Sequence, residues 1–160
     1  MPSILAQSRP ALLALLCFAG TLSSAQAQSA FKRPSDAVEY RQAGFELMAT
    51  HFKRLNDMAQ GKVPYDAKAV EENMAVIAVV AKLPFTAFVP GSDKAKGTEA
   101  LPEVWSQPAK FQEAADKLQA EVGKLQAAVK AGKQEDVKIA AGAVGQSCKA
   151  CHDSFKQKGH

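Results

Sequence analysis

The chain has 160 residues, of which 22% are charged and 47% hydrophobic, and its formal net charge is +4 at pH 7. Lysines and acids are interspersed, which excludes the concentrated basic face of a nucleic-acid-binding protein. Two of the three cysteines, Cys148 and Cys151, share one motif, which excludes a disulfide framework spread along the chain.

The N-terminal residues 1–27 are typical of a cleaved secretory signal peptide. An apolar run follows Arg9, and Ala25 and Ala27 supply the small residues that a signal peptidase reads. An uncleaved anchor is disfavoured, because the apolar run is about half of the ~20 residues that span a bilayer. We therefore expect an exported, soluble, periplasmic protein whose mature chain, residues 28–160, is a single domain with net charge +3.

Helical periodicity marks four segments of the mature chain. They are residues 35–60, 66–83, 107–131 and 134–157. Ser35 or Asp36 is expected to cap the first helix. Short turns make the first and last pairs antiparallel neighbours, whereas residues 84–106 form a long loop that crosses over or covers one end. Trp105 is expected to anchor this loop. The pattern predicts an all-α protein, an antiparallel four-helix bundle with a long loop between helices 2 and 3.

A charged residue, Arg41, interrupts the apolar stripe of the first helix between Val38 and Phe45. A lone guanidinium that faces a core is unfavourable unless an anion meets it. Arg41 therefore predicts an anionic partner. The alternative is that its side chain reaches solvent at the end of the bundle.

The fourth helix carries Cys148 and Cys151 on its core stripe, and His152 follows directly. The preceding turns are stripped of bulk, with Ala140, Ala141, Gly142, Ala143 and Gly145. A glycine inside a helix costs about 1 kcal/mol relative to alanine. The thinning favours a flat, bulky group that lies against this helix.

Four chemistries use the Cys-x-x-Cys pattern. A redox dithiol needs the N-terminus of a helix, whereas these cysteines lie in the last turns. A disulfide across one helical turn would be strained and would not need His152. A zinc site needs a fourth ligand, for which His160 is the candidate. Covalent haem uses Cys-x-x-Cys-His directly, and its attachment outside the cytoplasm agrees with export, so this chemistry is favoured.

The sequence resembles the cytochrome c′ family, the class II c-type cytochromes of the bacterial periplasm. The resemblance rests on the C-terminal Cys148–His152 motif with Phe155 and Lys156, on residues 37–52, and on LPFTAF and PEVW in the long loop. It covers the mature chain almost end to end. It implies a four-helix bundle with one covalently attached haem c per chain, usually in a homodimer that packs through the first two helices.

The resemblance also assigns site residues. Cys148 and Cys151 match the thioether anchors and His152 the axial iron ligand. The other matched positions are Arg41 and Gln42 at the haem propionates, Phe45 on the distal face, Phe88 in the haem pocket, Thr98 and Glu99 at the haem edge, and Lys156 on the proximal side. Relatives commonly carry arginine in place of Lys156, and lysine cannot reproduce its planar fork.

These assignments predict a five-coordinate, high-spin haem. Phe45 offers the iron no lone pair, so the open face would bind NO or CO, and the haem could exchange one electron with small redox proteins. The sequence shows no paired acid and base that would support catalysis, so we do not expect an enzyme. The alternative is a low-spin, six-coordinate electron carrier with Met48 as the sixth ligand. We expect no nucleic-acid partner and no membrane insertion after processing.

Overall fold

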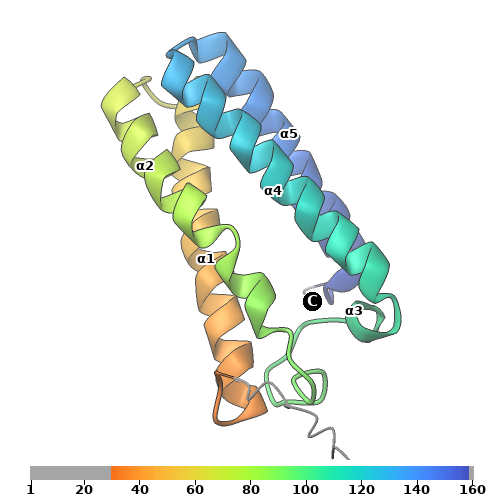
Figure 1. Ribbon diagram of the computed structural model, residues 1–160. Helices are drawn as coiled ribbons and strands as arrows, with labels where there is room; N and C mark the ends of the chain where they lie inside the picture. Colours follow the sequence, from red (N-terminus) through yellow and green to blue (C-terminus); the bar gives the residue numbers. More distant parts are fainter. Residues whose placement is uncertain (1–29, 159–160) are drawn as a thin grey trace, which may run out of the picture.

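The computed structural model describes residues 30–158, so the expected signal peptide, Cys17 and His160 lie outside the described residues. Figure 1 shows two pairs of long antiparallel helices that run alongside each other. The elements are α1 (Pro34–Ala59), α2 (Ala67–Val80), η1 (Leu83–Ala87), α3 (Glu103–Ser106), α4 (Pro108–Ala131) and α5 (Gln134–Phe155). The predicted all-α bundle is confirmed.

The ends of the helices follow from local hydrogen bonding. At α1 the N-cap is Arg33, and the expected cap at Ser35 or Asp36 is wrong. Asp36 lies in the first turn, where its carboxylate accepts hydrogen bonds from the backbone N–H and the Nε–H of Arg33, at 3.2 and 2.9 Å. Asp66 caps α2 by accepting from the backbone N–H of Ala69. Gly132, in the left-handed region at φ 74°, ends α4.

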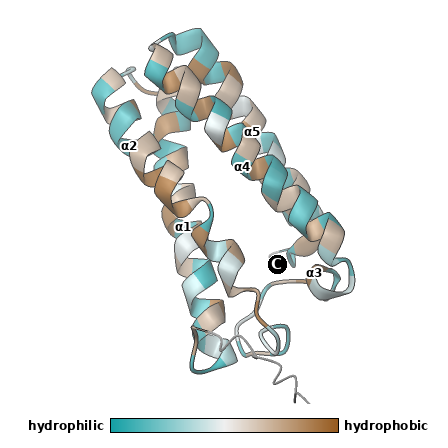
Figure 2. Cartoon of the chain, in the orientation of Figure 1, coloured by the Kyte–Doolittle hydropathy of each residue, from teal (hydrophilic) through white to brown (hydrophobic). Residues whose placement is uncertain are grey.

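The core forms where the four apolar stripes meet. Figure 2 shows apolar residues recurring between polar ones along each long helix. The largest fully buried side chains include one from every long helix: Leu55, Ile77, Leu125 and Val137. Each such aliphatic side chain contributes about 1.5–3 kcal/mol when it is removed from water. No helix within residues 30–158 is long and apolar enough to cross a membrane.

The crossover loop, residues 84–106, carries structure that the periodicity did not predict. It begins within η1 and ends on α3, a single turn. Residues 99–101 of the loop pair with the end of α5 and the chain that follows it. The N–H of Leu101 donates to the Phe155 carbonyl at 2.9 Å, and the N–H of Gln157 donates to the Glu99 carbonyl at 2.8 Å. Figure 1 shows α3 beside the end of α5. The loop therefore covers the end of the bundle that carries the cysteine motif.

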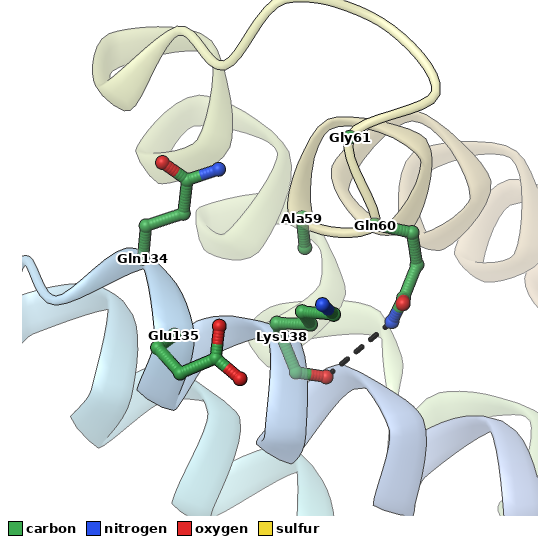
Figure 3. A pocket seen from close by; sticks show the side chains of 6 residues that line it. All are labelled: Ala59, Gln60, Gly61, Gln134, Glu135 and Lys138. Atoms are coloured by element: carbon green, nitrogen blue, oxygen red, sulfur yellow. Dashed lines mark hydrogen bonds between the residues drawn. The ribbon is translucent and has the colours of Figure 1, made fainter.

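A surface depression of about 340 Å³ lies at the other end of the bundle. Figure 3 shows its lining, formed by Ala59, Gln60, Gly61, Gln134, Glu135 and Lys138. The Gln60 amide donates to the Lys138 carbonyl across it at 3.4 Å. Lys138 and Cys151 are thirteen residues apart on α5, or about 20 Å at 1.5 Å per residue. This depression is therefore separate from the cysteine motif.

Candidate functional site

Both cysteines of the motif are free thiols on the last two turns of α5, and both are half-buried. Cys148 packs against the hydrophobic core. Cys151 lines a groove of about 490 Å³, together with Lys110 and Lys117 of α4 and Ser154 of α5. Burial raises the pKa of Cys148, and it raises the pKa of Cys151 to about 11 with a smaller contribution from Cys148. Both thiols are therefore neutral at pH 7.

His152 follows the second cysteine, and its position on the helix turns it away from the core toward solvent. Partial burial of the ring, and then the charge of Lys156, lower the pKa of His152, so the neutral imidazole that can ligate a metal is favoured. Among the residues that the structure describes, no three His, Cys, Asp or Glu side chains gather as a metal-binding group. The zinc alternative depends on His160, outside the described residues.

The glycines of α5 are not required by the packing of the protein alone. A Cβ atom at Gly142 would meet no neighbour within 4 Å, and at Gly145 it would make only an ordinary contact, 3.9 Å from the Phe52 ring. Gly44 on α1 differs, because its Cβ would lie 2.9 Å from Cγ of Pro84. Close packing of η1 on α1 thus explains Gly44, whereas the thinning of α5 leaves room for another group.

Arg41 is buried, with 3% of its surface exposed, so it does not reach solvent. Nη1 donates to the Ala87 carbonyl at 3.1 Å and to Ser92 Oγ at 2.8 Å; Nη2 donates to the Ser92 carbonyl at 3.2 Å and to Thr98 Oγ1 at 2.7 Å. All four acceptors are neutral, and burial lowers the pKa of Arg41. Sequence reasoning predicted an anion at Arg41 and missed this set of loop acceptors.

The other predicted edge residues bind one another around the same loop. The Gln42 amide donates to the Gly97 carbonyl at 2.8 Å. Thr98 accepts from Arg41 and from the backbone N–H of Ala100. Glu99 forms an ion pair with Lys156 at 2.9 Å. The structure thus brings Arg41, Gln42 and Thr98 together, and it places Glu99 against Lys156, one turn beyond His152.

The distal and pocket residues belong to a continuous aromatic cluster, formed by Phe45, Phe85, Phe88, Trp105, Phe111 and Phe155. Phe45 meets Phe85 edge-on at 5.4 Å and lies 6.4 Å from Phe88, between ring centroids. Phe111 links Phe88, at 4.7 Å, to Phe155, at 5.3 Å. The cluster thus runs from α1 to the turn of α5 after Cys151. Its members Phe85, Phe111 and Phe155 were not predicted as site residues.

Trp105 was predicted from the sequence only as an anchor for the loop. Its ring lies 6.2 Å from that of Phe88, and the Arg41 guanidinium carbon lies 5.8 Å from its centroid. Its Nε1 is buried and has no hydrogen-bond partner, which is true of no other side-chain nitrogen or oxygen atom in the described part of the chain. A buried donor left without an acceptor costs about 1–3 kcal/mol.

The residues present therefore fit a bound haem. The thiols are unlinked, α5 has open space beside Gly142, the buried cation of Arg41 lacks an anion, and the buried N–H of Trp105 lacks an acceptor. A haem carries apolar faces, two vinyl groups that thiols can attack, and two carboxylates. The fold and the site define a class of protein: a helical bundle whose last helix offers the donor set for covalent haem.

Comparison with known proteins identifies the family within this class. The family model described as Cytochrome C' matches residues 36–156. Cytochrome c′ of Rubrivivax gelatinosus is 55% identical over 128 residues, which cover 80% of this chain and 99% of that relative. Its crystal structure matches with a TM-score of 0.78 at 54% identity over 79% of this chain and 99% of that one. A nitric oxide complex of a leucine-to-alanine variant of cytochrome c′ from Alcaligenes xylosoxidans matches with a TM-score of 0.75 at 42% identity, covering 81% of this chain and 99% of that one.

The chain therefore belongs to the cytochrome c′ family, as its sequence predicted. Membership of this family implies haem c as the cofactor. The role of each matched residue stays a prediction.

Proposed function

We propose that the protein carries one haem c per chain, attached to Cys148 and Cys151 through thioether bonds and ligated by His152, and that it binds NO and CO and exchanges one electron. The observation that carries this proposal is the arrangement on α5, where two unlinked neutral thiols stand one turn apart beside an imidazole whose pKa is lowered. The nitric oxide complex in the family, and a carbon monoxide complex of another variant from the same organism, support gas binding here.

The bound haem would supply an iron that takes a neutral diatomic ligand and changes its charge by one electron. The chain's own residues would control access to it. Phe45 has no lone pair and is held edge-on by Phe85, so it keeps water and protein donors away from the distal side. This supports a five-coordinate, high-spin iron. The resemblance to the cytochrome c′ family assigns Phe45 to the distal face and Phe88 to the haem pocket, and both rings belong to the aromatic cluster.

Arg41 would serve two groups at once. Its four terminal hydrogens go to the crossover loop, so Nε–H is the donor left for a haem carboxylate, and its charge is not balanced by any acceptor there. Thr98 accepts two hydrogen bonds, and its own hydroxyl hydrogen can be donated to the haem edge. Glu99 holds Lys156 by an ion pair on the side of His152.

The alternative is a low-spin electron carrier with Met48 as sixth ligand. Met48 is 7% exposed and belongs to the hydrophobic core of the bundle, one turn beyond Phe45. It would have to leave that packing to reach the iron, which favours the five-coordinate form.

The protein is proposed to act as a carrier rather than an enzyme, because the site gathers aromatic rings, one guanidinium and thiols rather than a paired acid and base. Small redox proteins and diatomic gases would be its partners. We also propose export to the periplasm by residues 1–27, with residues 28–160 as the mature domain, since covalent haem of this type is attached outside the cytoplasm.

A homodimer through α1 and α2 is part of the proposal. Tyr40 and Leu47, two turns apart on α1, are 40% and 44% exposed, and Val79 and Leu83, about one turn apart, are 69% and 40% exposed. Tyr40 and Leu47 share one face of α1, and a second copy would cover it together with Val79 of α2 and Leu83 of η1. Sedimentation should give a dimer that Leu47→Glu dissociates, whereas Ile139→Glu on α5 leaves it intact. An unaltered protein that sediments as a monomer would contradict the dimer, and a Leu47→Glu variant that stays dimeric would contradict this interface.

The absorption spectrum tests the haem proposal. The protein is produced in the periplasm and recorded in the ferric and ferrous states, before and after addition of CO. High-spin bands and a CO-induced change in the ferrous form are expected. Low-spin bands that do not respond to CO would favour the Met48-ligated carrier, and a colourless, zinc-loaded protein would contradict both.

A further inference from the structure

Trp105 occupies the one-turn helix α3, where the crossover loop meets the end of α5. Its indole packs on Phe88 and lies against Arg41, so the ring is fixed by neighbours from two parts of the chain. Its Nε1–H has no hydrogen-bond acceptor. Burial without an acceptor is unfavourable, and the other buried side-chain donors and acceptors within residues 30–158 all have partners. The orphaned N–H therefore points to an acceptor from outside the chain.

The neighbours of Trp105 define the chemistry of that acceptor. Arg41 brings a full positive charge into a buried place, and its four terminal hydrogens meet only carbonyl and hydroxyl oxygens. No ion pair joins Arg41 to a carboxylate within residues 30–158, and Glu99 of the loop is paired with Lys156 instead. An acceptor that satisfies an indole N–H and also balances a guanidinium is an anion with a hydrogen-bonding oxygen, which describes a carboxylate.

We propose that the Nε1–H of Trp105 donates a hydrogen bond to a carboxylate of the bound haem, next to Arg41. The inference rests on the proposed haem function and adds a residue to it. Trp105 is a binding residue here: it fixes one carboxylate and so the rotation of the haem within the aromatic cluster. The same side chain also anchors the loop, as the sequence predicted, because its ring packs on Phe88 and lies against Arg41.

The chain contains a single tryptophan, which makes the indole directly observable in the haem-loaded protein. Ultraviolet resonance Raman spectroscopy of the ferric protein reports whether the indole N–H is hydrogen-bonded. Visible-excited resonance Raman reports the bending bands of the haem carboxylates. We expect a hydrogen-bonded indole, and we expect Trp105→Phe to shift one carboxylate bending band and to lower the reduction potential, because a donor that neutralises negative charge near the iron is lost.

Two matched proteins separate the hydrogen bond from packing. Replacing Trp105 by 3-benzothienylalanine keeps the bicyclic ring and removes only the N–H. It should shift the carboxylate band as Trp105→Phe does, without the loss of packing that the smaller phenyl ring causes. Phe88→Leu changes the packing on the indole and keeps the donor, so the indole band should stay hydrogen-bonded. A preparation without haem would contradict the proposed function itself. A free indole N–H in haem-loaded protein, or an unchanged carboxylate band in the benzothienyl protein, would overturn this inference alone.

Discussion

Replacing Arg41 by methionine tests how far one buried guanidinium holds the crossover loop. Arg41→Met keeps an apolar stem of similar reach and removes four hydrogen bonds from a charged donor. At about 1.5 kcal/mol each, these bonds contribute about 6 kcal/mol. Removal of the buried charge also relieves a desolvation penalty of several kcal/mol, about half of that gain. We expect the free energy of unfolding to fall by about 3 kcal/mol.

The assay is urea denaturation of the haem-loaded protein, followed both by far-ultraviolet circular dichroism and by haem absorption. Arg54→Met on the same helix is the matched control, because Arg54 is exposed and the change in charge is the same. It should alter stability by no more than about 0.5 kcal/mol. A loss below about 1 kcal/mol for Arg41→Met, similar to that of the control, would refute the idea that the guanidinium organises the loop.

Three further predictions concern single positions. Phe45→Ala should speed CO binding to the ferrous protein and lower stability by about 2–3 kcal/mol, because a half-buried ring is lost; unchanged stopped-flow kinetics would remove Phe45 from the distal role. Gly44→Ala should destabilise by about 1–3 kcal/mol, since its Cβ would lie 2.9 Å from Pro84, whereas Gly142→Ala meets no protein atom and should not destabilise the haem-free chain in thermal unfolding. In that haem-free chain, alkylation of Cys151 should rise about tenfold per pH unit up to its pKa of about 11, because only the thiolate reacts; a plateau near pH 9 would contradict the burial of this thiol.

The four long helices were predictable because each carries apolar residues at helical spacing over several turns. Only a helix places residues at that spacing on one face. The two short helices were not, since η1 spans five residues and α3 four, too few for any periodicity. The cap at Arg33 was missed for a related reason. Asp36 has the residue type of a cap, but it accepts from the Arg33 backbone from inside the first turn.

The site likewise contains a part that the sequence predicts and a part that only the folded chain brings together. Cys148, Cys151 and His152 are neighbours in the sequence, so the motif shows itself at once. The contacts of Arg41 join residues 46 to 57 positions apart, and they depend on how the crossover loop folds. A charged residue on an apolar stripe predicted that Arg41 needs partners, but it could not say which. The unpartnered, buried N–H of Trp105 likewise emerges only when all its neighbours are in place.

The backbone pairing between the crossover loop and the chain beyond α5 has a consequence for local stability. Ala100 and Lys156 form an isolated bridge, flanked by the hydrogen bonds of Leu101 and Gln157. If residues 155–157 detach from the loop, the hydrogen bonds of Leu101 and Gln157 break together. The amide hydrogens of Leu101 and Gln157 should therefore exchange with deuterium as one cooperative unit. Residues 155–157 are thus bound to the loop that covers the cysteine motif.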